Sequence, residues 1–122
     1  VARHNFSELQ LPNIELIEGN FDDRLPELLK SLTIEQKQLD FVFIDGNHRK
    51  EPTLRYFQQL LPLLHEHSVL IFDDIHWSEQ MEAAWEEIKK SPAVTLSIDL
   101  FFIGIVYFRK ENKVNKDFMI RF

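Results

Sequence analysis

LDFVFIDGNH (Leu39–His48) and HSVLIFDDIH (His67–His76) are the two stretches that decide the fold of this chain. Each contains a short apolar run, Phe41–Ile44 in the first and Val69–Phe72 in the second, and each run ends at an aspartate. Runs this short, rich in Val, Ile and Phe and without alternation, are typical of strands that are buried on both faces. The sequence therefore predicts two strands from the interior of a sheet.

A helix is predicted between these two strands. Over Thr53–His65 the apolar side chains recur at helical spacing, at Leu54, Phe57, Leu61 and Leu64. A strand, a helix and a strand in succession form a right-handed crossover unit, which makes the two strands parallel. Both strands then end at the same edge of the sheet, which is the edge where open α/β sheets bind ligands. We expect the aspartates that follow the strands to meet there.

Size, charge and composition narrow the class of protein. With 122 residues the chain is long enough for one domain with a hydrophobic core, and its net charge of −6 argues against a nucleic-acid partner. The absence of cysteine excludes disulfides, thiol nucleophiles and thiolate metal sites. No apolar run has the length of a membrane span, and VARHNFSELQ lacks the apolar core of a signal peptide. We expect a soluble cytoplasmic domain that binds neither nucleic acid nor membrane.

The residues before the central unit predict a helix, a strand and a second helix. The first helix covers Ala2–Gln10, and the strand covers Ile14–Ile17. Asp22 or Asp23 is expected to cap the second helix, because carboxylates accept hydrogen bonds from the free N–H groups of a first turn. Its core-facing side chains recur at helical spacing, at Leu25, Leu28, Leu29 and Leu32.

The residues after the central unit change character. Ser78 is expected to cap a helix over Glu79–Lys90. Val94–Leu100 alternates and Phe101–Phe108 is nearly continuously apolar, and the short connection between them requires an antiparallel hairpin. A last alternating run, Phe118–Phe122, predicts one more strand. The fold class is therefore α/β, with parallel strands first and an antiparallel hairpin near the C-terminus.

In this order the stretches IELIEGNF, LDFVFIDGNH, HSVLIFDDIHW and IDLFFIGIVYFRK resemble the C-terminal part of class I S-adenosylmethionine-dependent methyltransferases. The set is most similar to the small-molecule O-methyltransferase-like group. The resemblance implies a Rossmann-like, mostly parallel sheet that ends in an antiparallel hairpin, whose last strand inserts beside its neighbours. It covers nearly the whole chain and rests on the ordered set, because no single motif in it is specific.

The resemblance also implies positions for the cofactor. Asn20 and Phe21 would border the adenine of S-adenosylmethionine, just beyond the strand over Ile14–Ile17. Ile44, Asp45 and Gly46 would lie near its methionine part and the transferred methyl group.

Some relatives bind a divalent metal through an aspartate after one strand and an acidic pair after the next, which here correspond to Asp45, Asp73 and Asp74. Neighbouring parallel strands lie about 4.8 Å apart, so carboxylates at their ends can share a hard cation such as Mg²⁺. Such a cation would lower the pKa of a substrate hydroxyl and orient it toward the methyl group. The alternative is structural: Asp73 or Asp74 caps the following helix, and Asp45 starts a turn with Gly46 and Asn47.

His48 and His76 follow the two strand ends. A histidine there could act as general base on a substrate hydroxyl, because its pKa lies near working pH. His48 is the better candidate, since it follows Asp45 closely. The predicted catalytic residues are therefore Asp45 and His48. The alternative for each histidine is a loop residue hydrogen-bonded to a backbone carbonyl. Trp77 could form the wall of a substrate pocket, whereas Trp85 fits a buried helix face.

The chain departs from the family pattern in its glycines. Gly19, Gly46 and Gly104 are its three glycines and lie far apart, so the family's glycine-rich loop is not present. We therefore expect residues 1–122 to form a partial class I methyltransferase domain that lacks the N-terminal cofactor-binding half. The strand over Ile14–Ile17 would then have no partner, and the strand over Phe41–Ile44 would expose an apolar edge. Because such edges recruit other strands, we expect either re-pairing of the sheet, a homo-oligomer or pairing with a second chain.

These features predict an enzyme that transfers a methyl group from S-adenosylmethionine to an oxygen of a small molecule, with Mg²⁺ as a candidate second cofactor. The alternative is a truncated, non-catalytic methyltransferase remnant that acts as an interaction module. A glycine-rich strand, turn and helix upstream of Val1 would favour the enzyme.

Overall fold

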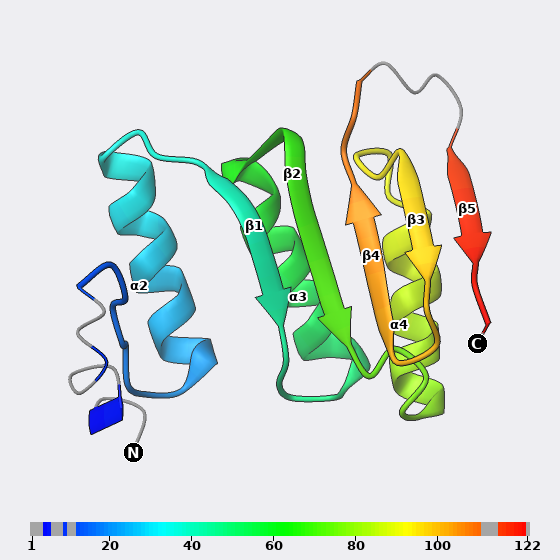
Figure 1. Ribbon diagram of the computed structural model, residues 1–122, viewed down its shortest axis with the longest axis horizontal. Coiled ribbons are helices and arrows are strands. Elements are labelled where there is room, and N and C mark those ends of the chain that lie inside the picture. The colour runs from blue at the N-terminus through cyan, green and yellow to red at the C-terminus, as the bar shows by residue number, and fades with distance from the viewer. Residues whose placement is uncertain (1–3, 6–8, 10–11, 111–114, 122) are drawn as a thin grey trace.

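The computed structural model of the protein describes residues 4–5, 9, 12–110 and 115–121, and in these it shows a five-stranded sheet with helices along it (Figure 1). The helices are α2 (Phe21–Ile34), α3 (Lys50–Leu60) and α4 (Glu79–Lys89), and a short 3₁₀ helix, η1 (Leu61–Leu63), follows α3 directly. The strands are β1 (Leu39–Ile44), β2 (Leu64–Asp73), β3 (Leu96–Asp99), β4 (Ile103–Tyr107) and β5 (Lys116–Met119). The helix predicted over Ala2–Gln10 falls mostly outside the described residues.

The sheet has the strand order β1-β2-β4-β3-β5. β1 pairs with β2 in parallel, with Phe41 opposite Val69 and Ile44 opposite Phe72, and α3 makes the crossover between them. β4 lies antiparallel between β2 and β3, and β5 is parallel to β3. The predicted α/β, Rossmann-like sheet with an inserted hairpin strand is therefore confirmed. Four strands, all but β4, end at the same edge of the sheet (Figure 1).

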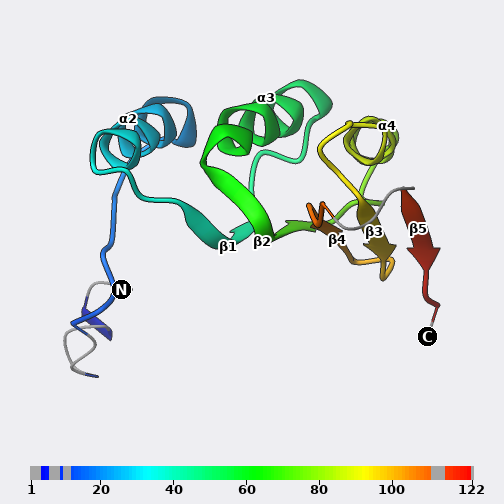
Figure 2. The ribbon, with the colours of Figure 1, turned by 90° about the horizontal axis from the view of Figure 1, so that it is seen from above.

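All three labelled helices lie on one face of the sheet (Figure 2). Along β2 the side chains that point toward them, such as Leu70 and Phe72, are buried, whereas Val69 and Ile71 on the other face are only partly covered. On β1 the outward-pointing Phe41 is 61% exposed. The prediction that these strands are buried on both faces is therefore wrong for the described residues, because no helix covers the second face.

The strand predicted over Ile14–Ile17 is also wrong. The structure assigns no strand there, and both Ile14 and Ile17 are exposed. A run of this length is stable as a strand only beside a hydrogen-bonded neighbour, and none reaches it. Among the described residues nothing pairs with the outer edge of β1, so the expected apolar edge is present and the sheet has not re-paired to cover it.

The N-terminus of α2 is capped one residue before the helix begins. Asn20 accepts a hydrogen bond at Oδ1 from the Asp22 N–H at 2.9 Å, so the predicted cap at Asp22 or Asp23 is wrong. The helix starts at Phe21, which places both aspartates in the first turn. Their negative charge is favourable there, because the helix dipole is positive at its N-terminus. The predicted leucine face is correct in position, with Leu29 buried and Leu25 and Leu32 packed against the core.

The C-terminal part follows the predicted order. The Ser78 hydroxyl caps α4 by accepting a hydrogen bond from the Met81 N–H at 3.2 Å, as expected. β3 and β4 form the predicted antiparallel hairpin. The last strand begins at Lys116 and ends at Met119, earlier than the predicted Phe118–Phe122, of which Phe122 lies outside the described residues.

Part of the core lies between α4 and the sheet. Trp85 is buried there, as predicted, with its ring directly over Gly104 of β4. A Cβ atom at position 104 would lie 2.6 Å from the ring of Trp85, so glycine is required for this close approach of helix and strand. None of the helices in the described part of the chain combines the length and apolar character that crossing a bilayer demands.

Candidate functional site at the carboxyl edge of the sheet

The turns that follow β1 and β2 bring four polar side chains together. Asp45, His48, Asp73 and Asp74 each offer one ligand atom, and these atoms all lie within 4.8 Å of one another. The parallel pairing of β1 with β2 causes this, because it ends both strands at the same edge. Of these residues, Asp45, Asp73 and Asp74 are the predicted metal ligands, and Asp45 and His48 are the predicted catalytic pair. The structure therefore gathers all four in one cluster, which we call the acidic cluster.

The backbone at both turns adopts the left-handed conformation. Asn47 has a φ of 49° and Asp74 a φ of 54°, values that Asn and Asp tolerate better than other residues. The turn after β1 is the one expected of Asp45, Gly46 and Asn47. The expected alternative role of Asp73 or Asp74 as a helix cap is not seen, because Ser78 caps α4.

The carboxylates of the acidic cluster repel one another. Burial raises the pKa of Asp73 above its ordinary value, and so do a hydrogen bond with Asp45 and the negative charges of Asp74 and Asp45. Asp73 therefore holds a proton more readily than an isolated, solvent-exposed aspartate does. A divalent cation placed among these oxygens would relieve the same repulsion.

His48 completes the acidic cluster from the side of β1. Its Nε2 atom lies 3.5 Å from Asp45 Oδ1 and 3.4 Å from Asp74 Oδ2. The atom is buried but has no hydrogen-bond partner. The carboxylate oxygens suit a hard cation such as Mg²⁺, and an imidazole nitrogen can bind either a metal or a proton. The donor set therefore fits a divalent cation.

The residues expected to border the cofactor lie beside this cluster. A Cβ atom at Gly46 would lie 3.2 Å from Cε2 of Phe21, so the start of α2 and the turn after β1 are in close contact. Phe21 is 49% exposed and, with Ile44, lines an apolar cavity of about 100 Å³ between α2 and β1. Asn20 is occupied as the cap of α2. An exposed aromatic ring beside a glycine turn suits a flat heteroaromatic group, so these residues fit part of a nucleoside.

Sequence reasoning missed the network that joins these two segments. The Tyr56 hydroxyl on α3 donates to Asp22 at 2.9 Å and accepts from Asn47 Nδ2 at 3.2 Å. Arg55 also pairs with Asp22, at 2.6 Å. The Tyr56 and Arg55 hydrogen bonds lower the pKa of Asp22. A tyrosine beside Phe57 on the buried face of a predicted helix was the available signal, because a buried phenol needs a polar partner.

The other two aromatic candidates lie on the loop between β2 and α4. His76 does not bond a backbone carbonyl: its Nε2 lies 2.7 Å from Asp99 Oδ2 and its Nδ1 lies 3.1 Å from Glu82 Oε1. Trp77 is 68% exposed, and its ring centroid lies 5.9 Å from that of His48. Trp77 is therefore beside the acidic cluster, whereas His76 faces a separate cavity described below.

The profile of a family described as a methyltransferase domain matches residues 2–75, which is more than half of the chain. The chain belongs to this methyltransferase family. The match includes β1, α3 and β2, and with them every residue of the acidic cluster, whereas α4 and the last three strands lie beyond it. No curated protein and no solved structure matches the chain.

Proposed function

We propose that the protein is an S-adenosylmethionine-dependent methyltransferase that methylates an oxygen of a small molecule with the help of a divalent cation. One observation carries the proposal: in a member of a methyltransferase family, three carboxylates and an imidazole nitrogen without a hydrogen bond gather where the parallel strands end. That edge is where open α/β sheets bind their ligands. The preference for oxygen rests on the cation, since a metal activates hydroxyl groups.

The cofactor would supply a methyl group on a positively charged sulfur, which any nucleophilic oxygen can attack. Phe21 offers an exposed ring for the adenine, and Gly46 lets the backbone approach because it has no side chain. Ile44 lines the small apolar cavity next to them. Asp45 lies between these residues and the rest of the acidic cluster. It could therefore contact both the methionine part of S-adenosylmethionine and a cation.

His48 would act on the acceptor. On transfer of the methyl group from the cofactor's sulfur to the acceptor oxygen, Nε2 of His48 would take up the hydroxyl proton. Asp45 and Asp74 lie 3.5 Å and 3.4 Å from this nitrogen and would stabilise the imidazolium that results. A divalent cation held by Asp45, Asp73 and Asp74 would supply positive charge that lowers the pKa of the hydroxyl.

Calorimetric titration of S-adenosylhomocysteine tests the proposal. We expect the product cofactor to bind, and to bind more tightly when Mg²⁺ is present. Asp45→Asn should remove the Mg²⁺ dependence, because it takes a charged ligand from the acidic cluster.

Asp40→Asn is the matched control for this titration. Asp40 lies on β1 as well, but at the other end of the strand, where it pairs with His65 at 2.5 Å. This variant should bind S-adenosylhomocysteine as the unchanged protein does. Absence of binding to the unchanged protein, with or without Mg²⁺, would reject the proposed function.

A second candidate function follows from the exposed edge of β1. Phe41 and Phe43 are 61% and 50% exposed on a strand with no outer partner in the described part of the chain. Such a surface suits a non-catalytic remnant that acts as an interaction module. Failure of the titration combined with tight binding of a second protein chain would favour this candidate over the enzyme.

A further inference from the structure

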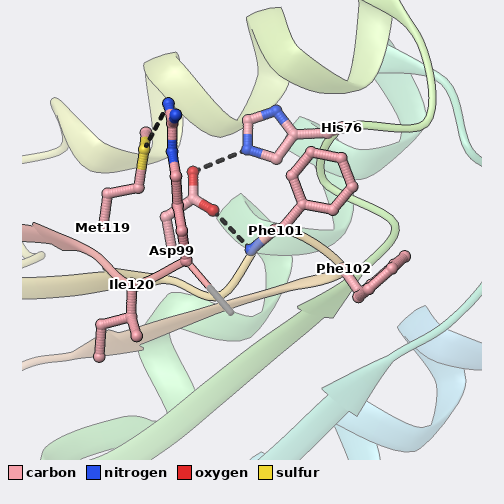
Figure 3. A pocket seen from close by; sticks show the side chains of 7 residues that line it. His76, Asp99, Phe101, Phe102, Met119 and Ile120 are labelled. Atoms are coloured by element: carbon pink, nitrogen blue, oxygen red, sulfur yellow. Dashed lines mark hydrogen bonds and ion pairs between the residues drawn. The ribbon is translucent and has the colours of Figure 1, made fainter.

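A second and larger cavity lies at the same edge of the sheet, outside the part of the chain that matches the family. It has a volume of about 590 Å³, within the range typical of small-molecule sites. The turn between β3 and β4 forms one side and the residues after β5 form the other (Figure 3). Its lining consists of His76, Asp99, Phe101, Phe102, Met119, Ile120 and Arg121.

Aromatic rings dominate one wall of this cavity. Phe101 and Phe102 are 56% and 66% exposed, and their rings meet edge to face with centroids 5.1 Å apart. The imidazole of His76 stacks on Phe101, with centroids 5.4 Å apart and an angle of 21° between the planes. Two adjacent exposed phenylalanines at the edge of a cavity form a surface that a flat apolar ligand would cover.

The turn that presents these rings is strained and is held in place. Phe101 has a φ of 71°, in the left-handed region that bulky side chains rarely adopt. Asp99 is almost fully buried and fixes the turn, because its Oδ1 accepts from the Phe101 N–H at 2.8 Å and its Oδ2 from His76 at 2.7 Å. Ligand sites often contain a strained backbone residue that the surrounding contacts hold in place.

Among the described residues that line the cavity, Arg121 is the cation that a ligand can reach. Asp99 and Glu82 flank both ring nitrogens of His76, so neither nitrogen is free to bind a ligand. In the described part of the chain, the guanidinium of Arg121 contacts only the sulfur of Met119, at 3.6 Å. Arg121 can therefore receive an anion opposite the aromatic wall, in the fork geometry that suits a carboxylate.

The cavity adjoins the acidic cluster through the backbone. The N–H of Asp74 donates to the carbonyl oxygen of Phe102 at 2.7 Å, so the backbone of the turn that carries the two rings contacts a residue of the cluster. A ligand in the cavity would therefore lie next to the turn that holds Asp74.

We propose that this cavity holds the methyl acceptor and selects an aromatic molecule that carries an acidic group, with its ring against Phe101 and Phe102 and its anion on Arg121. The inference rests on the proposed function for the identity of the reaction. It adds the substrate class, a hydroxylated aromatic acid, and two specificity residues, Phe102 and Arg121.

The test is a binding experiment that requires no methyl transfer. The full chain is titrated with a hydroxybenzoate, the corresponding neutral hydroxybenzamide and the saturated hydroxycyclohexane carboxylate, and backbone amide NMR shifts are followed. We expect the hydroxybenzoate to bind most tightly and to shift Phe101 and Phe102. Arg121→Gln should weaken the hydroxybenzoate about tenfold, the effect of one charge-assisted contact, and leave the hydroxybenzamide unchanged.

Two variants control this result. Arg109→Gln removes an exposed arginine that stacks on Tyr107 of β4, away from the cavity, and should leave all three affinities unchanged. Phe102→Leu keeps an apolar side chain at an exposed position and should weaken both aromatic ligands. Similar affinities for all three ligands, or shifts confined to other parts of the chain, would overturn the inference.

The outcome is separable from that of the proposed function. If S-adenosylhomocysteine binds and the hydroxybenzoate does not, the inferred substrate class is rejected and the methyltransferase proposal stands. If S-adenosylhomocysteine displaces the hydroxybenzoate, the cavity belongs to the cofactor and the inference is rejected. If the hydroxybenzoate binds but S-adenosylhomocysteine does not, the proposed function is rejected and with it the role of acceptor.

Discussion

At the residue scale, the acidic cluster holds like charges close together. Burial, together with the hydrogen bond to Asp45 and the negative charges of Asp74 and Asp45, keeps the pKa of Asp73 raised. For a carboxyl group, a raised pKa means that the fold favours the neutral form. The stability that protonated Asp73 contributes to the folded state is complete below the ordinary pKa of 3.8. It is lost as the pH rises through the folded-state pKa. At neutral pH the acidic cluster therefore destabilises the fold unless a cation is bound.

Asp73→Asn should raise the melting temperature at neutral pH in metal-free buffer, because asparagine imitates the neutral acid. The group is largely solvent-screened, so we expect a gain of only about 2–4 °C. The gain should vanish in acid, where Asp73 is itself protonated. Mg²⁺ should stabilise the unchanged protein more than the variant. Thermal melts with and without Mg²⁺ measure this, and a lower melting temperature for Asp73→Asn at neutral pH would contradict it.

His76 should titrate above the ordinary imidazole pKa of 6.5. Burial disfavours its charged form, but hydrogen bonds with Asp99 and Glu82 outweigh this and raise its pKa. The stabilisation from the charged ring is therefore present below 6.5 and is lost as the pH rises through the folded-state pKa.

An NMR titration of the His76 ring protons measures this shift. Asp99→Asn should lower the pKa of His76, read from the inflection of the titration curve, substantially. Glu82→Gln should lower it less, since Glu82 is the more exposed partner. An inflection unaffected by Asp99→Asn would show that the pair does not hold the proton.

At the scale of elements, the close contact of α4 with β4 holds the hairpin of β3 and β4 against the helix. Gly104 allows the ring of Trp85 to lie directly on the strand. The hairpin, the cap at Ser78 and the burial of Trp85 were all predictable, because alternation, capping and helical spacing are local signals. The need for glycine at position 104 was not, because it depends on which helix crosses which strand.

Gly104→Ala should destabilise the fold by about 1–3 kcal/mol, the usual cost of forcing an extra carbon into a packed core. The new Cβ would lie 2.6 Å from Trp85, so helix and strand must separate. Urea denaturation measures the change. In a Trp85→Phe background the added cost of Gly104→Ala should be smaller, and equal costs in both backgrounds would mean that the contact with Trp85 is not the cause.

At the scale of the whole molecule, the helices in the described part of the chain cover one face of the sheet, and none of them lies on the other (Figure 2). Exposed phenylalanines on β1 lie at the unpaired edge of that sheet. The sequence predicted the apolar edge correctly but not the bare face. Strand burial depends on what packs from both sides, and a continuous apolar run does not reveal that.

We expect the protein to self-associate as its concentration rises, because apolar edges and faces pair with one another. Phe43→Lys should shift sedimentation toward the monomer, since a charge on an edge strand opposes strand pairing. Glu35→Lys, on the exposed end of α2, is a matched control that should not. Identical sedimentation of the unchanged protein at low and high concentration would contradict the expectation.

One part of the candidate site was predictable from the sequence, and another part was not. Asp45, His48, Asp73 and Asp74 could be placed together from the sequence, because parallel strands end at one edge. The His76–Asp99 pair and the cavity beside Arg121 could not, since they join residues from the loop after β2, the end of β3 and the segment after β5. Such long-range contacts leave no periodic pattern in the sequence.

The backbone amide NMR spectrum, recorded first with S-adenosylhomocysteine and then with a trace of Mn²⁺, tests the central claim most directly. We expect S-adenosylhomocysteine to shift the amide signals of Phe21 and Gly46. We expect the paramagnetic ion to broaden the signals of Asp45–His48 and Asp73–Asp74 until excess Mg²⁺ displaces it. Broadening centred on His65 and His67, at the opposite end of the sheet, or no response of Phe21 and Gly46, would contradict a methyltransferase site at the carboxyl edge.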